Sequence, residues 1–219
     1  MPIRKFPLVK GEIYHIFSKS IAGFEIFRGN SEYQRIKSLL KYYKISQPPL
    51  KFSAFMEIKD KEKFCQRHLT TKGNLVDIIA YCFMPTHIHL ALRQLKENGI
   101  SIFMKNILDS YGRYFNIKTK RKGPLWESKF QNVLVETDEQ LLHLTRYIHL
   151  NPVTAYSVDK PEDWEFSSYK EFLGEIEDKE RICNYSEVLD IEPQSYKEFV
   201  HSQIDYQREL AEIKELFLD

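Results

Sequence analysis

Two histidines stand one residue apart in the stretch FMPTHIHLALR, residues 83 to 93. The neighbouring residues are apolar and typical of a β-strand, so His87 and His89 are expected to project from the same face. At a rise of roughly 3.3 Å per residue their Cβ atoms would lie about 7 Å apart, which lets both imidazoles reach one ion. The alternative is a pair of hydrogen-bonded strand histidines with no ligand, and this pair alone does not decide between the two.

A second candidate group lies in ETDEQLLHLTRYIHLNPV, residues 136 to 153. Thr137 with a glutamine three positions later predicts the start of a helix, and Pro152 predicts its end. A polar stripe recurs on this helix at every fourth position, so that its side chains share one side. It consists of His143, Tyr147 and Asn151. The alternative is that the tyrosine only caps the edge of the core and the asparagine only closes the helix.

Hydrophobic periodicity supplies the elements that must position these groups. Their order, β, α, an insertion, β, β, α, β, predicts an α+β fold of the ferredoxin-like βαββαβ type, with an antiparallel sheet backed by helices. The strands are expected at 12–20, 75–83, the histidine run and 130–136, the helices at 31–45 and 98–117, and an insertion at 46–72 with one helix at 52–69. We expect residues 1–156 to form one domain, followed by an acidic, mostly helical C-terminal extension at 157–219.

The net charge of +1 conceals an uneven distribution. Residues 1–156 hold 25 Lys and Arg against 13 Asp and Glu, whereas residues 157–219 hold 7 against 18. A basic body of this kind favours a polyanionic ligand such as nucleic acid. Its densest basic segment also carries aromatic residues that can stack on bases. The DNA-binding candidates in it are Arg113, Tyr114, Lys118, Lys120, Arg121 and Lys122.

Composition excludes several other classes of protein. With 42% hydrophobic and 14% aromatic residues, the chain can bury a sizeable core. No apolar run reaches the roughly 18 residues that span a bilayer, and the start lacks the pattern of a signal peptide, so we expect a cytoplasmic protein. Three widely spaced cysteines predict reduced thiols and neither a disulfide framework nor a cysteine zinc site.

Several segments together resemble one family. MPTHIHLAL is similar to the histidine, hydrophobic, histidine motif of the IS200-like single-tyrosine (Y1, HUH) transposases, and YIHLNPV resembles the tyrosine helix of their REP-associated tyrosine transposase branch. YHIFSKSIAGFEIF and YGRYFNIKTKRKGPLWESKF extend the likeness, which covers most of residues 12–174. Lys19 departs from the pattern, because many relatives have arginine there, and the tail after about residue 175 shows no likeness.

The resemblance implies a function. It implies a metal-dependent single-stranded DNA nuclease and strand transferase, acting on hairpin or palindromic repeat DNA, in which Tyr147 attacks the phosphate and leaves a 5′-phosphotyrosyl link. It also implies that His87, His89 and Asn151 hold Mg²⁺ or Mn²⁺. The expected protein is nucleoid-associated, and the sequence leaves open whether it is a monomer or a homodimer.

Three other functions compete with this interpretation. A catalytically silent DNA-binding descendant of a transposase would bind hairpins without cutting them, although the intact candidate residues argue against it. A 2H phosphoesterase needs a second HxT or HxS motif, and none is visible. A zinc hydrolase needs a further ligand at recognisable spacing, which is also missing.

Overall fold

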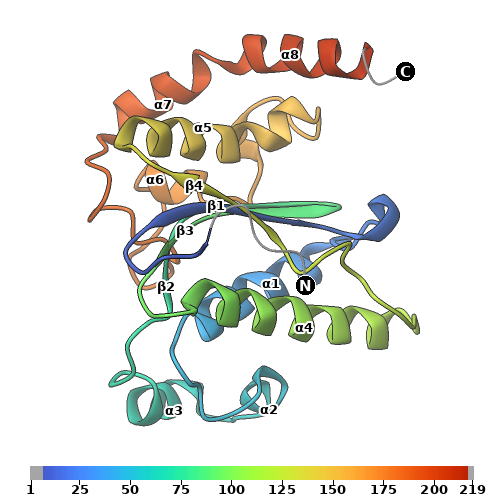
Figure 1. The fold of residues 1–219 in the computed structure, drawn as a ribbon, viewed down its shortest axis with the longest axis vertical. Helices are drawn as coiled ribbons and strands as arrows, with labels where there is room; N and C mark the ends of the chain where they lie inside the picture. Colours follow the sequence, from blue (N-terminus) through green and yellow to red (C-terminus); the bar gives the residue numbers. More distant parts are fainter. Residues whose placement is uncertain (1–6, 217–219) are drawn as a thin grey trace.

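The computed structural model describes residues 7–216, and its centre is a four-stranded antiparallel sheet with the strand order β2-β3-β1-β4 (Figure 1). This order and the sequence of elements confirm the predicted ferredoxin-like arrangement. The strands are β1 (Ile13–Lys19), β2 (Val76–Met84), β3 (His87–Gln94) and β4 (Gln131–Val135).

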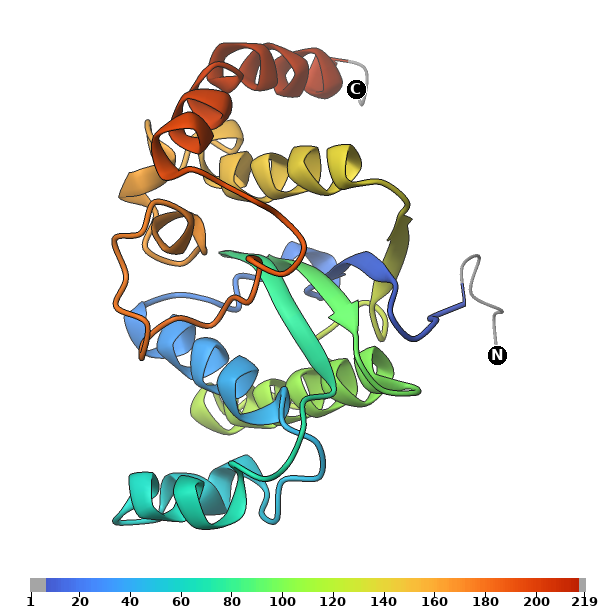
Figure 2. The same cartoon turned by 90° about the vertical axis from the view of Figure 1, so that its left-hand side faces the viewer.

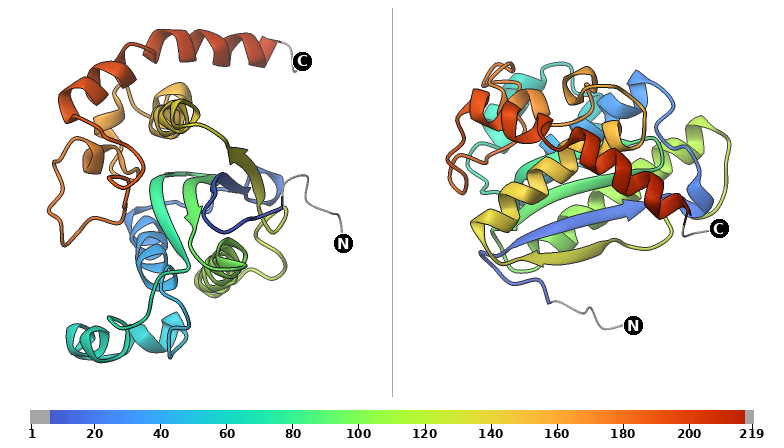
Figure 3. Two further views of the ribbon diagram at one scale, coloured as in Figure 1. Left: turned by 60° about the vertical axis from the view of Figure 1, so that its left-hand side comes forward. Right: turned by 90° about the horizontal axis from the view of Figure 1, so that it is seen from above.

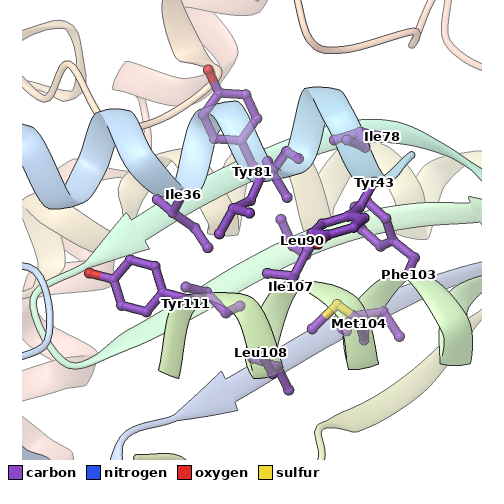
Figure 4. Close-up of a cluster of buried hydrophobic side chains, with 14 of the residues drawn as sticks. Ile36, Tyr43, Ile78, Tyr81, Leu90, Phe103, Met104, Ile107, Leu108 and Tyr111 are labelled. Atoms are coloured by element: carbon purple, nitrogen blue, oxygen red, sulfur yellow. The ribbon is translucent and has the colours of Figure 1, made fainter. Parts of the chain in front are cut away.

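Helices α1 (Asn30–Tyr43) and α4 (Gly99–Lys118) cover one face of the sheet (Figure 1). Their predicted apolar stripes are buried, and they interleave with side chains of β2 and β3 such as Tyr81 and Leu90 (Figure 4). The start of α4 packs so closely against the backbone of Leu75 that only glycine fits at position 99. A Cβ on Gly99 would lie 2.3 Å from the carbonyl oxygen of Leu75. This face is therefore a dry, tightly packed core.

The segment between α1 and β2 contains two short helices where one was predicted. They are α2 (Phe52–Met56) and α3 (Lys61–His68), and they lie at the outer end of the α1 and α4 layer (Figure 2). The single-helix prediction was wrong because Asp60 caps a new helix, accepting a hydrogen bond from the backbone N–H of Lys63 at 2.9 Å. Helix propensity alone does not reveal this break.

Helix α5 (Asp138–Thr154) covers the opposite face of the sheet (Figure 1). The predicted start is confirmed, because the Thr137 side chain accepts a hydrogen bond from the Gln140 backbone N–H at 3.1 Å. The predicted end at Pro152 was wrong. Proline lacks an N–H but its φ angle is compatible with a helix, so the last turn continues until Ala155 donates to the Asn151 carbonyl at 3.0 Å.

The C-terminal segment packs outside α5 and along the free edge of β2. Although β2 is an edge strand, all nine of its residues are buried. The backbone of residues 166–184 supplies the missing partners: Phe83 donates to the Phe166 carbonyl at 3.0 Å and Asn184 donates to the Ile78 carbonyl at 2.8 Å. This cover protects an edge that would otherwise be free to pair with another chain.

Of the remaining elements, the two C-terminal helices lie outside α5 (Figure 3). No helix in the described part of the chain is long and apolar enough to cross a membrane. The three cysteines are free thiols, of which only Cys82 is fully buried. The other elements are the 3-10 turns η1 (Ile21–Gly23) and η2 (Pro161–Asp163), and the helices α6 (Tyr169–Phe172), α7 (Pro193–His201) and α8 (Ile204–Leu216).

Candidate active site

The two histidines lie at the start of β3, on the face of the sheet that α5 covers. In the antiparallel register with β1, His87 is opposite Lys19 and His89 is opposite Phe17. Directly opposed residues project from the same face. The strand therefore places both imidazoles where the sequence predicted, on a single face.

An aromatic cluster joins these histidines to the tyrosine of α5. Ring centroids are 4.9 Å apart for His87 and His89, and 5.6 Å apart for His89 and Tyr147. His15 of β1 completes the cluster, with its ring centroid 5.2 Å from that of His89 and 5.9 Å from that of Tyr147. Residues from two strands and a helix thus meet above the sheet, and Tyr147 remains 44% exposed.

Each histidine of the pair has its Nδ1 atom engaged. His89 Nδ1 lies 3.0 Å from His15 Nε2, and His87 Nδ1 lies 3.0 Å from Thr86 Oγ1. Within residues 7–216, neither Nε2 atom of the pair makes a hydrogen bond. Both rings are therefore oriented through one nitrogen and leave the other available for a ligand.

Burial keeps the imidazoles uncharged. It lowers the pKa of His15 and that of His87 to about 4, and it lowers the pKa of His89 well below its usual range. The positive charge of Lys19 contributes to the lowered pKa of both strand histidines. Neutral imidazole is the form that binds a metal ion, so the cluster is in a binding-competent state at neutral pH.

Tyr147 and Asn151 are one turn apart on α5. Burial raises the pKa of the Tyr147 phenol, and a hydrogen bond from Asn151 opposes that shift. The Asn151 amide also donates to the Tyr147 carbonyl at 2.8 Å. In the part of the chain that is described, no hydrogen bond joins Asn151 to either strand histidine.

The two other histidines of α5 point away from the tyrosine. His143 contacts Arg146 and the ring of Phe199 on α7. His149 is fully buried, with Nδ1 2.7 Å from Tyr196 Oη and Nε2 2.8 Å from Ser168 Oγ. His149 thus ties α5 to the C-terminal segment, and His143 does not share the active face that its spacing suggested.

Sequence reasoning missed His15 and missed the position of Lys19. Both are two positions from Phe17 on β1, so the three side chains share one face of the strand. This spacing of two is visible in EIYHIFSKS. Only the pairing of β1 with β3, however, tells which face of β1 meets the histidine pair. That long-range register is absent from a local pattern.

The basic segment lies apart from this cluster. Arg113, Tyr114 and Lys118 are on α4, against the opposite face of the sheet, and Lys118 forms an ion pair with Glu32 at 2.6 Å. Lys120, Arg121 and Lys122 occupy the loop that follows, which returns to the end of β1 through a hydrogen bond from Ile21 to the Leu125 carbonyl at 2.9 Å. A role of these six residues in DNA binding stays a prediction.

In the part of the chain that the structure describes, no group of three or more His, Cys, Asp and Glu side chains is arranged to hold a metal ion. An ion at the histidine pair would therefore need other ligands. Suitable oxygen donors are the amide of Asn151, water and the phosphate of a substrate.

Two comparisons with known sequences find similarity to transposases. Residues 53–151 match the family model for IS200-like transposases. A putative REP-associated tyrosine transposase of Haemophilus influenzae is 31% identical over 104 residues, which cover 42% of this chain and 58% of the relative. The match thus spans little more than half of that relative's length.

A solved structure supports the fold. A REP-associated tyrosine transposase bound to a REP hairpin aligns with a TM-score of 0.54 at 15% identity, over 88% of this chain and 99% of the other. At this identity the likeness concerns the fold alone. Family model, relative and fold together confirm that this chain resembles the IS200-like transposases and their REP-associated tyrosine transposase branch.

Proposed function

We propose that the chain is a metal-dependent nuclease and strand transferase for single-stranded DNA, with Tyr147 as its nucleophile. The observation that carries this proposal is the half-exposed Tyr147 ring packed edge-on against His89 and His15. A tyrosine that served only the core would be buried, as Tyr111 is. All the proposed catalytic residues fall within residues 1–156, which we propose as the catalytic domain.

The donor set fits Mg²⁺ or Mn²⁺. His87 and His89 would each bind through Nε2, since Thr86 and His15 engage their Nδ1 atoms at 3.0 Å. Asn151 would add an amide oxygen, and water and phosphate oxygens would complete the set. A bound divalent ion would polarise the scissile phosphate and offset the charge that develops on it.

The chain's own residues then carry out the transfer. The Tyr147 oxygen attacks phosphorus, so a tyrosyl O–P bond forms while the bond from phosphorus to the 3′ oxygen breaks. The phenolic proton is lost and the departing 3′ oxygen gains one, which leaves a free 3′-OH and a 5′-phosphotyrosyl link. Because the link conserves a phosphodiester, a DNA 3′-OH can reverse the step and rejoin strands.

Lys19 is placed to assist the substrate phosphate. It is exposed and lies opposite His87 on the same face of the sheet. No carboxylate pairs with it among the residues described, so its ammonium group is available to an anion. We propose that it contacts the phosphate beside the scissile bond.

The proposed substrate is hairpin or palindromic repeat DNA. The REP hairpin bound to the structural relative and the basic character of residues 1–156 support this choice. Association with the nucleoid would follow from it, and a homodimer is the oligomeric alternative to a monomer. A catalytically silent hairpin binder is the second candidate function, favoured by the raised pKa of Tyr147, which disfavours the phenolate.

Cleavage separates the two candidates. A single-stranded hairpin labelled at its 3′ end is incubated with Mn²⁺ and the protein, and the products are resolved by denaturing electrophoresis. We expect a covalent adduct that carries the label and that Tyr147→Phe abolishes, since the substitution removes only the reacting oxygen. Tyr206→Phe is the matched control, because Tyr206 is 55% exposed but lies on α8. A wild type that binds the hairpin tightly without forming an adduct would establish the silent binder.

A further inference from the structure

A groove with a cavity volume of about 540 Å³ lies on the side of the sheet away from the candidate active site. Helices α1 and α4 and the start of α2 form its walls, so it uses the segment that the sequence sets apart as an insertion. Positive and aromatic side chains dominate the lining. The residues that matter here are Arg35, Tyr43, Lys51, Phe52, Arg113 and Tyr114.

Arg35 contacts two aromatic rings of the groove. Its guanidinium carbon lies 4.5 Å from the ring centroid of Phe52 and 5.0 Å from that of Tyr114. Its Nε atom is buried and makes no hydrogen bond in the described part of the chain. Arg35 also lines the groove, and the planar fork of terminal N–H groups on an arginine is suited to an oxyanion such as phosphate.

The other cations of the groove divide into two groups. Lys105 is paired with Asp109 at 2.8 Å and Lys118 is paired with Glu32 at 2.6 Å. Arg113 and Lys51 are exposed, and no carboxylate pairs with either one in residues 7–216. Together with Arg35, the groove therefore presents three positive charges, from three separate elements, that the protein does not neutralise.

We propose that this groove binds the phosphate backbone of a single DNA strand, as a second contact separate from the cleavage site. The inference rests on the proposed function for the identity of the polyanion. A cavity of this volume is of small-molecule size and admits a nucleotide or two but no duplex. Tyr114 is half-buried beside Arg35 and lines the same groove.

The test measures binding of a fluorescent, unstructured 20-nucleotide DNA strand at several salt concentrations, by anisotropy. Each lost phosphate contact on a single strand lowers the slope of log K against log salt by about 0.7. Arg113→Gln combined with Lys51→Gln should therefore reduce the slope by about 1.4 and weaken binding at 0.1 M salt by at least about tenfold. Lys10→Gln combined with Lys160→Gln removes the same charge from exposed positions outside the groove and should leave the slope unchanged.

Arg35→Lys distinguishes a built phosphate site from general attraction. It keeps the charge but loses the planar fork, so affinity should fall several-fold while the salt slope stays the same. An affinity equal to that of the wild type in this variant, or an unchanged slope in the Arg113 and Lys51 variant, overturns the proposal. Melting curves of each variant establish that it is folded.

Two competition experiments distinguish a DNA strand from a free nucleotide or free phosphate as the ligand of the groove. Inorganic phosphate and dTMP are added at millimolar concentration as competitors. Weak or no displacement supports a strand, whereas full displacement by dTMP overturns the strand and assigns a free nucleotide. The adduct assay on the wild type tests the proposed function independently. If the groove binds DNA but the protein forms no adduct, the groove inference stands and the proposed catalysis is rejected.

Discussion

The two faces of the sheet are covered by different kinds of side chain. The face beneath α1 and α4 is lined by apolar and aromatic side chains. The side that α5 covers holds four buried or half-buried histidines, His15, His87 and His89 on the strands and His149 on α5 itself, together with a tyrosine that reaches solvent. Buried polar groups cost free energy unless they are paired, and here each histidine has a partner. One face is therefore an apolar core alone, whereas the other combines an apolar core with a polar, reactive arrangement.

Removal of the histidine pair should have the largest effect. Replacing His87 and His89 by alanine should reduce adduct formation by about a thousandfold, because several kcal/mol of transition-state stabilisation depend on the metal ion. Hairpin affinity should change little, since phosphate contacts elsewhere dominate binding. His68→Ala, at an exposed position on α3, is the control. Undiminished cleavage in the double variant would mean that the pair holds no catalytic metal.

A core substitution on the other face should act on stability alone. Phe103→Ala removes a fully buried ring from α4 and should lower the free energy of unfolding by about 3–5 kcal/mol. The adjacent Ile102 is 44% exposed, so Ile102→Ala should cost far less. Urea denaturation measures both. If Phe103→Ala stays folded yet loses cleavage below its melting temperature, the two faces are not functionally separate.

His15→Ala should produce an intermediate effect. It leaves the proposed ligands intact but removes the partner of His89 Nδ1. Loss of such an orienting hydrogen bond weakens metal affinity by about 10- to 100-fold. A Mn²⁺ titration of adduct formation should therefore shift to higher concentration, while the rate at saturating Mn²⁺ partly recovers. An unshifted titration would make His15 a packing residue only.

A further prediction concerns pH. Burial lowers the pKa of His149 to about 3 and that of His15 and His87 to about 4, so the folded protein resists protonation that the unfolded chain accepts near pH 6.5. Each such histidine therefore makes the free energy of unfolding fall by up to about 1.4 kcal/mol per pH unit, as the pH drops from 6.5 towards 4. Urea denaturation at pH 7 and pH 5 tests this. Equal stabilities would contradict the buried, neutral state of the α5 face.

How much the sequence predicts also differs between the faces. The stripes of α1 and α4 were predictable because a 3.6-residue period reports burial locally. His87, His89 and Tyr147 stood out by spacing and by family likeness. His15 did not, and Lys19 was noted only as a departure from the family pattern. Their place beside the histidine pair depends on the register of β1 against β3, which is a contact between residues far apart in the chain.

The C-terminal segment shows the same limit. Its acidic composition suggested an appendage, but composition does not reveal pairing with a strand edge. Glu171 is buried and accepts hydrogen bonds from Tyr81 at 2.9 Å and from the backbone of Cys183 at 2.8 Å. The contact between Tyr81 and Glu171 joins residues 90 positions apart in the chain, so a local sequence pattern does not reveal it.

The central claim is that Tyr147 becomes covalently attached to DNA. The most direct measurement is mass spectrometry of the wild-type adduct, formed on a hairpin with Mn²⁺ and digested with protease and nuclease to leave a short nucleotide on the protein. Fragment spectra should place that nucleotide on Tyr147 and leave the nearby, exposed Tyr156 unmodified. A nucleotide found on Tyr156, Tyr114 or any other residue would contradict the account.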